Sequence, residues 1–313
     1  MSVYTIFGAT GLQGKSVALT LAEHLGPKAH IRAITRDPTS TRSQQLKDTV
    51  TSLGAQLTLV KHDLSQQTTA ALENALQGTE YLFLNSDSFA LREEETRIMQ
   101  EVVDAAVALP NLRLLLWSTL PDASKISGGK YTGVKHFQQK ARVDEHLHRV
   151  GQKIAWVGLQ LGWFAENVGD YHLLTEDADG TVAFKYAIAT AETAVPWTWI
   201  TKELGVAALK LFEKSATVEG LPEDVLRKSL PVCGWRATFG EVVAEFERQT
   251  GRKYRYETLG GWGNPELDDM NRFFRDFGLY EDWTVPAEPL RKIGVPSPTL
   301  SEFVSDYLVG HKV

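Results

Sequence analysis

Three glycines near the start of the chain have the spacing of a phosphate-binding turn. Gly8, Gly11 and Gly14 follow an apolar run at 3–7 and open an amphipathic segment, so the turn joins a strand to a helix. Such a turn directs backbone N–H groups and the positive end of a helix dipole at one point, which suits a pyrophosphate. The alternative is a glycine-rich turn that binds no ligand. The other residues of this predicted dinucleotide site are Thr10, Leu12 and Gln13.

Each glycine has its own expected role in the turn. Gly8 makes the tight turn, Gly11 lets the backbone approach the phosphates, and Gly14 lets the helix pack closely on the strand. The spacing is GxxGxxG rather than GxGxxG.

The end of the second predicted strand, at 31–35, indicates which nucleotide fits. An NAD site usually has an acid there for the ribose hydroxyls, whereas an NADP site usually has a basic residue for the 2′-phosphate. Thr35 stands where the acid is expected and Arg36 follows it, and a guanidinium binds a phosphate bidentately. We therefore expect NADP(H). If the register shifts by one or two residues, Asp37 becomes the ribose acid instead.

Polar residues at the ends of the next two strands extend the predicted cofactor site. Asp63 and Leu64 end the third strand and would contact the adenine, the carboxylate on the exocyclic amine and the leucine against the ring. Asn85 and Ser86 end the fourth strand and would lie near the nicotinamide ribose. The carboxyl ends of parallel strands meet at one edge of a sheet, so these residues would lie along one cofactor.

The first half of the chain alternates apolar strands with amphipathic helices, the pattern of a parallel sheet with helices on both faces. Strands are expected at 3–7, 31–35, 56–61, 81–85, 112–117 and 154–161. Helices are expected at 12–25, 42–53, 69–76, 92–108 and 133–150. This order predicts an α/β fold with a Rossmann-type, doubly wound parallel sheet over residues 1–161.

After residue 161 aromatic residues become dense and the alternation changes. Helices are expected at 201–213, 238–250, 265–277 and 299–308, with short strands near 181–186, 230–233 and 254–258. We interpret residues 162–313 as a smaller α+β region that faces the substrate, beside the carboxyl ends of the sheet strands. The chain is expected to return to the nucleotide-binding domain within 193–233.

Composition argues against several classes of function. The chain has 313 residues and a formal net charge of -6, which disfavours nucleic acid as the main partner. No apolar run is long enough to cross a membrane, and the eight histidines show no metal-ligand spacing. The one cysteine, Cys233, excludes an internal disulfide and lies at an apparent buried strand end, so we expect no cysteine nucleophile. Without a recognisable signal peptide, a cytoplasmic location is expected.

Several segments together resemble the NmrA-like family, which belongs to the atypical short-chain dehydrogenases and lies near the isoflavone-reductase-like enzymes. They are GATGLQGKSV, ITRDP, the DL after the third strand, LLWST, HFQQKARVDEHL and LGWFAENV, with a weaker likeness in ATFGEVVAEFERQTGRKYRYE. The resemblance covers nearly the whole chain and is most specific in the nucleotide-binding half. It implies a Rossmann-type fold and NADP(H) binding.

The resemblance also adds residues to the nicotinamide end of the site. Ser118 matches the family's serine at the end of the fifth strand, although a strand-end cap is the alternative role. The family's loop after the sixth strand runs beside the nicotinamide, and here it contains Gly162, Trp163, Phe164 and Asn167. Trp163 and Phe164 could equally be core residues.

Catalysis depends on the helix after the fifth strand. Short-chain dehydrogenases pair a proton-donating tyrosine with a lysine four residues later, which holds the nicotinamide ribose and lowers the pKa of the tyrosine. Tyr131 and Lys135 have this spacing, but the tyrosine follows a Gly-Gly loop and Gly133 is unfavourable in a helix. His136 and Lys140 match better by context, since ARVDE follows Lys140 as acidic positions follow the family lysine, and His136 then replaces the tyrosine. The alternatives are solvated lysines and a packed or capping histidine.

The leading hypothesis is an oxidoreductase, an NADPH-dependent reductase of an apolar or aromatic small molecule. Lys140 would position the ribose, and water, His136 or Tyr131 would supply the proton. One alternative is a regulator that senses NADP(H) without turnover and controls a protein partner, which the missing Tyr-x-x-x-Lys pair in the favoured register supports. Another is an NADP-dependent isomerase. The expected aromatic pocket favours the reductase, because a sensor has no need of a roomy apolar cavity.

Overall fold

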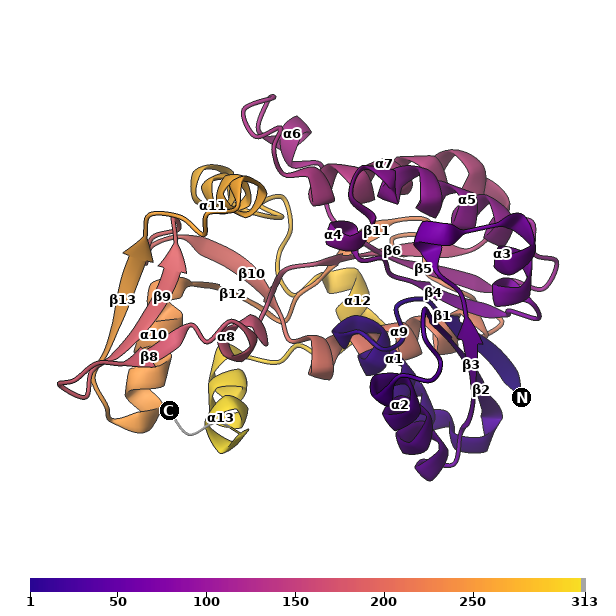
Figure 1. The fold of residues 1–313 in the computed structure, drawn as a ribbon, viewed down its shortest axis with the longest axis horizontal. Helices are drawn as coiled ribbons and strands as arrows, with labels where there is room; N and C mark the ends of the chain where they lie inside the picture. The colour runs from indigo at the N-terminus through magenta and orange to yellow at the C-terminus, as the bar shows by residue number, and fades with distance from the viewer. Residues whose placement is uncertain (311–313) are drawn as a thin grey trace.

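Seven parallel strands form the main sheet of the protein, whose computed structural model describes residues 1–310 (Figure 1). Their order across the sheet is β11 (Ser229–Val232), β6 (Trp156–Leu161), β5 (Leu114–Thr119), β4 (Tyr81–Leu84), β1 (Ser2–Ile6), β2 (Ala29–Thr35) and β3 (Gln56–Lys61). The strand order reverses between β1 and β4, and open α/β sheets bind their ligands at such a switch point. The predicted α/β class and Rossmann-type sheet are confirmed.

Helices cover both faces of this sheet (Figure 1). One face carries α1 (Leu12–Leu25), α2 (Thr41–Ser52) and α9 (Ile200–Ser215). The other carries α3 (Thr69–Leu76), α5 (Glu95–Val107) and α7 (Lys135–Val150). The central strands β4 and β5 are buried along their whole length, as expected for strands covered on both faces. We call the sheet and these helices the main lobe.

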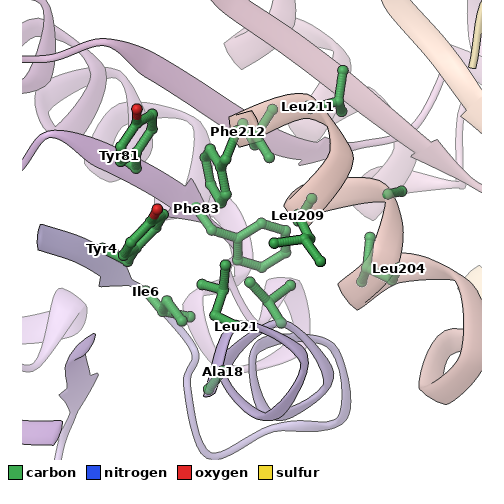
Figure 2. Packing of buried hydrophobic residues seen from close by; sticks show 14 of the residues in the cluster. Tyr4, Ile6, Ala18, Leu21, Tyr81, Phe83, Leu204, Leu209, Leu211 and Phe212 are labelled. Atoms are coloured by element: carbon green, nitrogen blue, oxygen red, sulfur yellow. The ribbon is translucent and has the colours of Figure 1, made fainter. Parts of the chain in front are cut away.

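The core on the α1 face joins the beginning of the chain to its middle (Figure 2). Leu21 of α1 and Leu209 of α9 pack against Phe83 of the sheet, and the rings of Tyr4 and Tyr81 stack with their centroids 4.8 Å apart. Helix α1 thereby has a fixed position, and its first turn lies at the carboxyl edge of β1.

The second lobe, drawn on the left of Figure 1, contains two small sheets and the helices around them. The sheets are β12 (Trp235–Thr238), β10 (Ala194–Thr198) and β7 (Trp163–Phe164), and β13 (Tyr254–Leu259), β9 (Val182–Ala187) and β8 (Leu174–Glu176). The helices are α8 (Asn167–Asp170), α10 (Phe239–Thr250), α11 (Pro265–Phe277) and α13 (Leu300–Gly310). Its core is rich in aromatic rings, including those of Trp163, Phe184, Tyr186, Trp197 and Phe239.

Three short helices lie outside this division, α4 (Ser88–Leu91), α6 (Ala123–Ile126) and α12 (Glu288–Lys292). Within residues 1–310, no helix combines the length and apolar character that a membrane span requires.

The chain re-enters the main lobe after β10. Residues 194–198 form β10 of the second lobe, because the ring of Trp197 packs within that aromatic core. The return begins with α9, where the Ser16 hydroxyl of α1 donates to the carbonyl of Ile200 at 2.8 Å, and ends with β11 paired to β6. The fifth strand runs from 114 to 119, two residues later than predicted, so Ser118 and Thr119 are part of it.

Asp144 fastens α7 to the edge strand β11. Its carboxylate accepts from the Ser229 hydroxyl at 2.8 and 2.9 Å, and burial raises the pKa of Asp144 to about 6. The folded state therefore favours the protonated acid, so this group's contribution to stability is largest below its ordinary pKa and is lost as the pH rises to about 6.

We expect Asp144→Asn to raise the melting temperature at pH 7, because its amide oxygen still accepts from Ser229 and carries no charge. The gain in unfolding free energy should be about 1–3 kcal/mol at pH 7, since one pKa unit corresponds to about 1.4 kcal/mol, and should vanish near pH 4. Thermal unfolding followed by circular dichroism at the two pH values measures this difference. A loss of stability at pH 7 would show that the charged form is the favoured one.

Candidate functional site

The loop between β1 and α1 has the shape of a dinucleotide-binding turn. Gly8 has a φ of 67°, which L side chains rarely adopt, and a Cβ on Gly14 would lie 2.3 Å from the Gly8 carbonyl oxygen. A Cβ on Gly11 would instead meet only that oxygen, at 3.4 Å. The first and third glycines therefore shape the turn, while the space in front of Gly11 is open. Helix α1 begins with no acidic residue and no side-chain cap, so its first N–H groups are left for a ligand.

A cavity of about 700 Å³ lies between the two lobes, beside this turn. We call it the interlobe cavity. Strand ends and loops of the main lobe line one side of it, and α11 and the aromatic residues of the second lobe line the other. Many predicted site residues meet there: Gly11, Leu12, Gln13, Asn85, Ser86, Ser118, His136, Lys140, Gly162, Trp163, Phe164 and Asn167.

The residues predicted to bind the adenosine half lie outside the interlobe cavity. Arg36 is exposed directly after β2, and Asp63 and Leu64 follow β3, so all three stand beyond β1 on the side away from α7. The Asp37 carboxylate accepts from the backbone N–H and hydroxyl of Thr39 at 2.8 and 2.6 Å, and these hydrogen bonds lower the pKa of Asp37. The Asp37 carboxylate is thus engaged in its own turn, and the exposed Arg36 precedes it.

Lys140, and not Lys135, reaches the interlobe cavity. The Lys140 ammonium donates to the carbonyl and hydroxyl oxygens of Ser86 at 3.2 and 3.1 Å and to Glu95 Oε1 at 3.0 Å. It also lies 4.9 Å from the centre of the Trp117 ring. Lys135 is exposed and pairs with Glu93. The two lysines are five positions apart, which puts them on different faces of α7.

Glu95, which sequence reasoning missed, is the buried counter-ion of Lys140. Its side chain is fully buried, and Oε1 also accepts from the hydroxyls of Ser86 and Ser88 at 2.6 and 2.9 Å. Within the described residues Oε2 has no hydrogen-bond partner. The sequence did contain a signal for Glu95, because it lies at helical spacing from Ile98, Met99 and Val102 on the buried face of α5. An acid on a buried face needs a partner for its charge.

His136 lines the interlobe cavity one turn before Lys140. Its Nδ1 lies 2.5 Å from Glu266 Oε1, and its backbone N–H donates to the same oxygen at 2.8 Å. The ring packs against Phe89, with 5.3 Å between ring centres. Glu266 belongs to α11, 130 residues away, and no local pattern in the sequence connects the two side chains.

Tyr131, which the sequence predicts as a catalytic candidate, is not among the residues that line the interlobe cavity. Its hydroxyl donates to Asp276 Oδ2 at 2.5 Å, and the Lys130 ammonium contacts the same oxygen at 2.6 Å. Burial and the neighbouring carboxylate raise the pKa of Tyr131, whereas a proton-donating tyrosine of this class needs a lowered one. Tyr131 precedes α7 and ties α11 to the main lobe.

Aromatic side chains form the far end of the interlobe cavity, and most of them were not predicted as site residues. The indole N–H of Trp163 donates to the Tyr186 hydroxyl at 2.8 Å, and that hydroxyl donates to Asn271 at 2.9 Å, so these rings are held in place. Trp163 is both a core residue and a cavity residue. The unpredicted apolar lining residues include Phe89, Phe137, Tyr171, Tyr186, Trp262, Leu267, Met270, Phe274 and Leu279.

The described residues offer neither a metal site nor a reactive cysteine. Within 1–310, no group of three histidine, cysteine, aspartate or glutamate side chains could hold a metal ion. Cys233 is buried, and burial raises the pKa of its thiol to about 12. The thiol therefore stays protonated at neutral pH and is a poor nucleophile.

Solved structures share this fold over nearly the whole chain. The monoclinic form of NmrA, a negative transcriptional regulator, has a TM-score of 0.77 at 18% identity and covers 99% of this chain and 98% of its own. NmrA in complex with NADP has a TM-score of 0.70 at 20% identity, over 100% and 92%. The leucoanthocyanidin reductase–NADPH complex of Vitis vinifera has a TM-score of 0.69 at 16% identity, over 99% and 100%.

Comparisons of the sequence point to the same family as the structural similarity does. The NmrA-like family domain-containing oxidoreductase cpsB of Aspergillus campestris is 27% identical over 302 residues, which cover 87% of this chain and 81% of that protein. The corresponding oxidoreductase FrzB of Cladobotryum sp is 27% identical over 295 residues, 87% of this chain and 82% of that protein. The sequence model of the NmrA-like family matches residues 2–303 of this chain. The chain therefore belongs to the NmrA-like family.

Proposed function

We propose that this protein is an NADPH-dependent reductase of a neutral apolar or aromatic small molecule. The observation that carries the proposal is the interlobe cavity, which joins the Gly11 turn and Lys140 to an aromatic pocket in one continuous space. A hydride donor and an apolar acceptor could meet in such a space. The relatives cpsB and FrzB are oxidoreductases, and the structurally similar leucoanthocyanidin reductase binds NADPH, which supports the same reading.

The residues present fit a dinucleotide. The open space before Gly11 and the uncapped start of α1 suit the pyrophosphate, and Arg36 suits the 2′-phosphate. Asn85 lines the interlobe cavity, and its Oδ1 is buried without a hydrogen-bond partner in the described residues, so this oxygen is a candidate acceptor for a ribose hydroxyl. When bound, NADPH would supply a hydride to an electrophilic carbon.

The protein's own groups would orient the substrate and supply the proton. Lys140 brings a positive charge to the nicotinamide end, and it would reach the ribose by exchanging one of its bonds to Ser86. His136 stands beside the aromatic end and is the proton donor in this proposal. In the described residues the charged or basic side chains on the cavity lining are Lys140, His136 and Asp87. The lysine is already paired with Glu95, and the Asp87 carboxylate accepts from the Ala90 N–H at the start of α4, so the pocket suits a neutral substrate.

We expect Arg36→Ala to weaken NADPH binding by about 10- to 150-fold and to leave NADH binding unchanged. Hydrogen bonds to charged groups are worth about 1.5–3 kcal/mol, and NADH has no 2′-phosphate to lose them. Calorimetric titration with both nucleotides measures the effect. Lys28→Ala, an exposed cation at the other end of β2, is the matched control. Unchanged NADPH affinity in Arg36→Ala would remove the basis for the cofactor preference.

Turnover is tested by mixing the protein with NADPH and a panel of hydrophobic aromatic aldehydes, ketones, imines and enones, and following oxidation of the nicotinamide. The proposal expects oxidation that depends on one of these classes and is lost in His136→Phe. Tight NADPH binding without oxidation by any class would favour the sensing regulator instead.

A further inference from the structure

The geometry of His136 leaves one nitrogen for the substrate and ties the other to the protein. Both Nδ1 and the backbone N–H of His136 contact Glu266 Oε1, at 2.5 and 2.8 Å. Nε2 lies on the opposite side of the ring, has no hydrogen-bond partner in the described residues, and belongs to a side chain that lines the interlobe cavity. A carboxylate on Nδ1 fixes which nitrogen presents itself to a ligand.

Glu266 is itself held in place. Its backbone N–H donates to the Asn264 cap of α11 at 3.1 Å, so it stands in the first turn of a helix of 13 residues, where the helix dipole favours a carboxylate. The His136 ring is packed against Phe89 and Phe137, with ring centres 5.3 and 5.0 Å away. The pair therefore has one arrangement, with the acid on the second lobe and the imidazole on the main lobe.

We propose that Glu266 is a positioning residue for catalysis, which holds His136 in the tautomer protonated on Nδ1 and stabilises the imidazolium that donates from Nε2. This inference rests on the proposed reductase function. It gives α11 a chemical role besides closing the cavity, because His136 is oriented only when α11 stands against α7. The arrangement is analogous to a carboxylate that orients a catalytic histidine through its Nδ1–H.

The proton step balances as follows for a carbonyl substrate. The carbonyl carbon receives the hydride, the π bond of C=O breaks toward oxygen, and that oxygen takes the proton from His136 Nε2. The Nε2–H bond breaks and leaves a neutral imidazole, whose Nδ1–H still donates to the Glu266 carboxylate. A proton from bulk solvent then returns to Nε2 through the mouth of the cavity, where Tyr171 and Phe89 are exposed, so the overall reaction consumes one solvent proton.

The tautomer can be measured without substrate or cofactor. The full chain is labelled with ¹⁵N-histidine, and His136→Gln identifies the His136 signals in the nitrogen–proton correlation spectrum. We expect neutral His136 to carry its proton on Nδ1 in the wild type and in Glu266→Gln, whose amide oxygen still accepts. We expect Glu266→Ala to lose this preference. A wild-type proton on Nε2, or an unchanged tautomer in Glu266→Ala, would overturn the inference.

Measurements of kcat distinguish a Glu266 that positions His136 from a Glu266 that only holds α11 in place. We expect Glu266→Ala to lower kcat by about 10²-fold with an unchanged Kd for NADPH, and Glu266→Gln to recover part of the loss. Asp276→Asn is the matched control, because it removes another carboxylate of α11 that binds Tyr131 and does not contact His136. Equal losses of kcat in Asp276→Asn and Glu266→Ala would show that only the seating of α11 matters. If no substrate class is reduced, the proposed function is wrong. The tautomer measurement is independent of that result, because it needs neither substrate nor cofactor, and it still tests whether Glu266 orients His136.

Discussion

Removing the Lys140 charge is expected to lower turnover by about 10²–10⁴-fold, whereas Lys135→Met leaves turnover unchanged. Lys140 is buried at the interlobe cavity with Ser86 and Glu95, and Lys135 forms an exposed pair with Glu93. The two lysines belong to the same helix, so the comparison separates the proposed ribose contact from any general effect on α7. Steady-state kinetics with NADPH and the substrate class found by the panel measure both variants.

A substitution at Lys140 has to be combined with a substitution of its counter-ion, Glu95. Glu95 is fully buried, and a buried charge left alone commonly costs about 3–5 kcal/mol of stability. Lys140→Met is therefore combined with Glu95→Gln, which keeps an acceptor for Ser86 and Ser88. Circular dichroism and NADPH titration show whether this double variant folds and binds. A folded, NADPH-binding double variant with wild-type turnover would exclude Lys140 from catalysis.

Gly11→Val is expected to abolish NADPH binding and leave the melting temperature unchanged. The turn at Gly11 is extended, with φ of −83° and ψ of 170°, so a branched residue fits the backbone. Its side chain would fill the open space that we assign to the pyrophosphate. Calorimetry and circular dichroism on the same sample measure binding and folding together.

Gly14→Val provides the contrast within the same turn. A Cβ on Gly14 would lie 2.3 Å from the backbone oxygen of Gly8, and backbone cannot move aside cheaply. We expect this variant to lose stability first and binding as a consequence. Wild-type NADPH affinity in Gly11→Val would mean that the turn serves the packing of α1 on the sheet and holds no ligand.

The main lobe could be predicted from sequence because its signals are local. Apolar runs such as the one ending at Phe7 have the length of buried strands, and Gly26 and Gly54 mark where the intervening helices end. The fifth strand was displaced by two residues because Ser118 and Thr119 are polar by type, yet both are buried within the sheet.

Local sequence patterns predicted only some of the residues at the candidate site. Residues at strand ends could be placed because parallel strands bring their carboxyl ends together. Glu266 and Phe274 could not, because they belong to a helix whose position depends on contacts across the whole chain. Tyr131 was a candidate by spacing alone, and its contact with Asp276 is invisible in the local sequence.

A crystal structure of the protein grown with NADPH tests the central claim most directly. We expect the pyrophosphate at the Gly11 turn, the 2′-phosphate on Arg36, and nicotinamide C4 facing the aromatic end of the interlobe cavity, beside His136. A nicotinamide ring turned away from that cavity, or a cavity filled by the side chains of α11 once NADPH is bound, would contradict it.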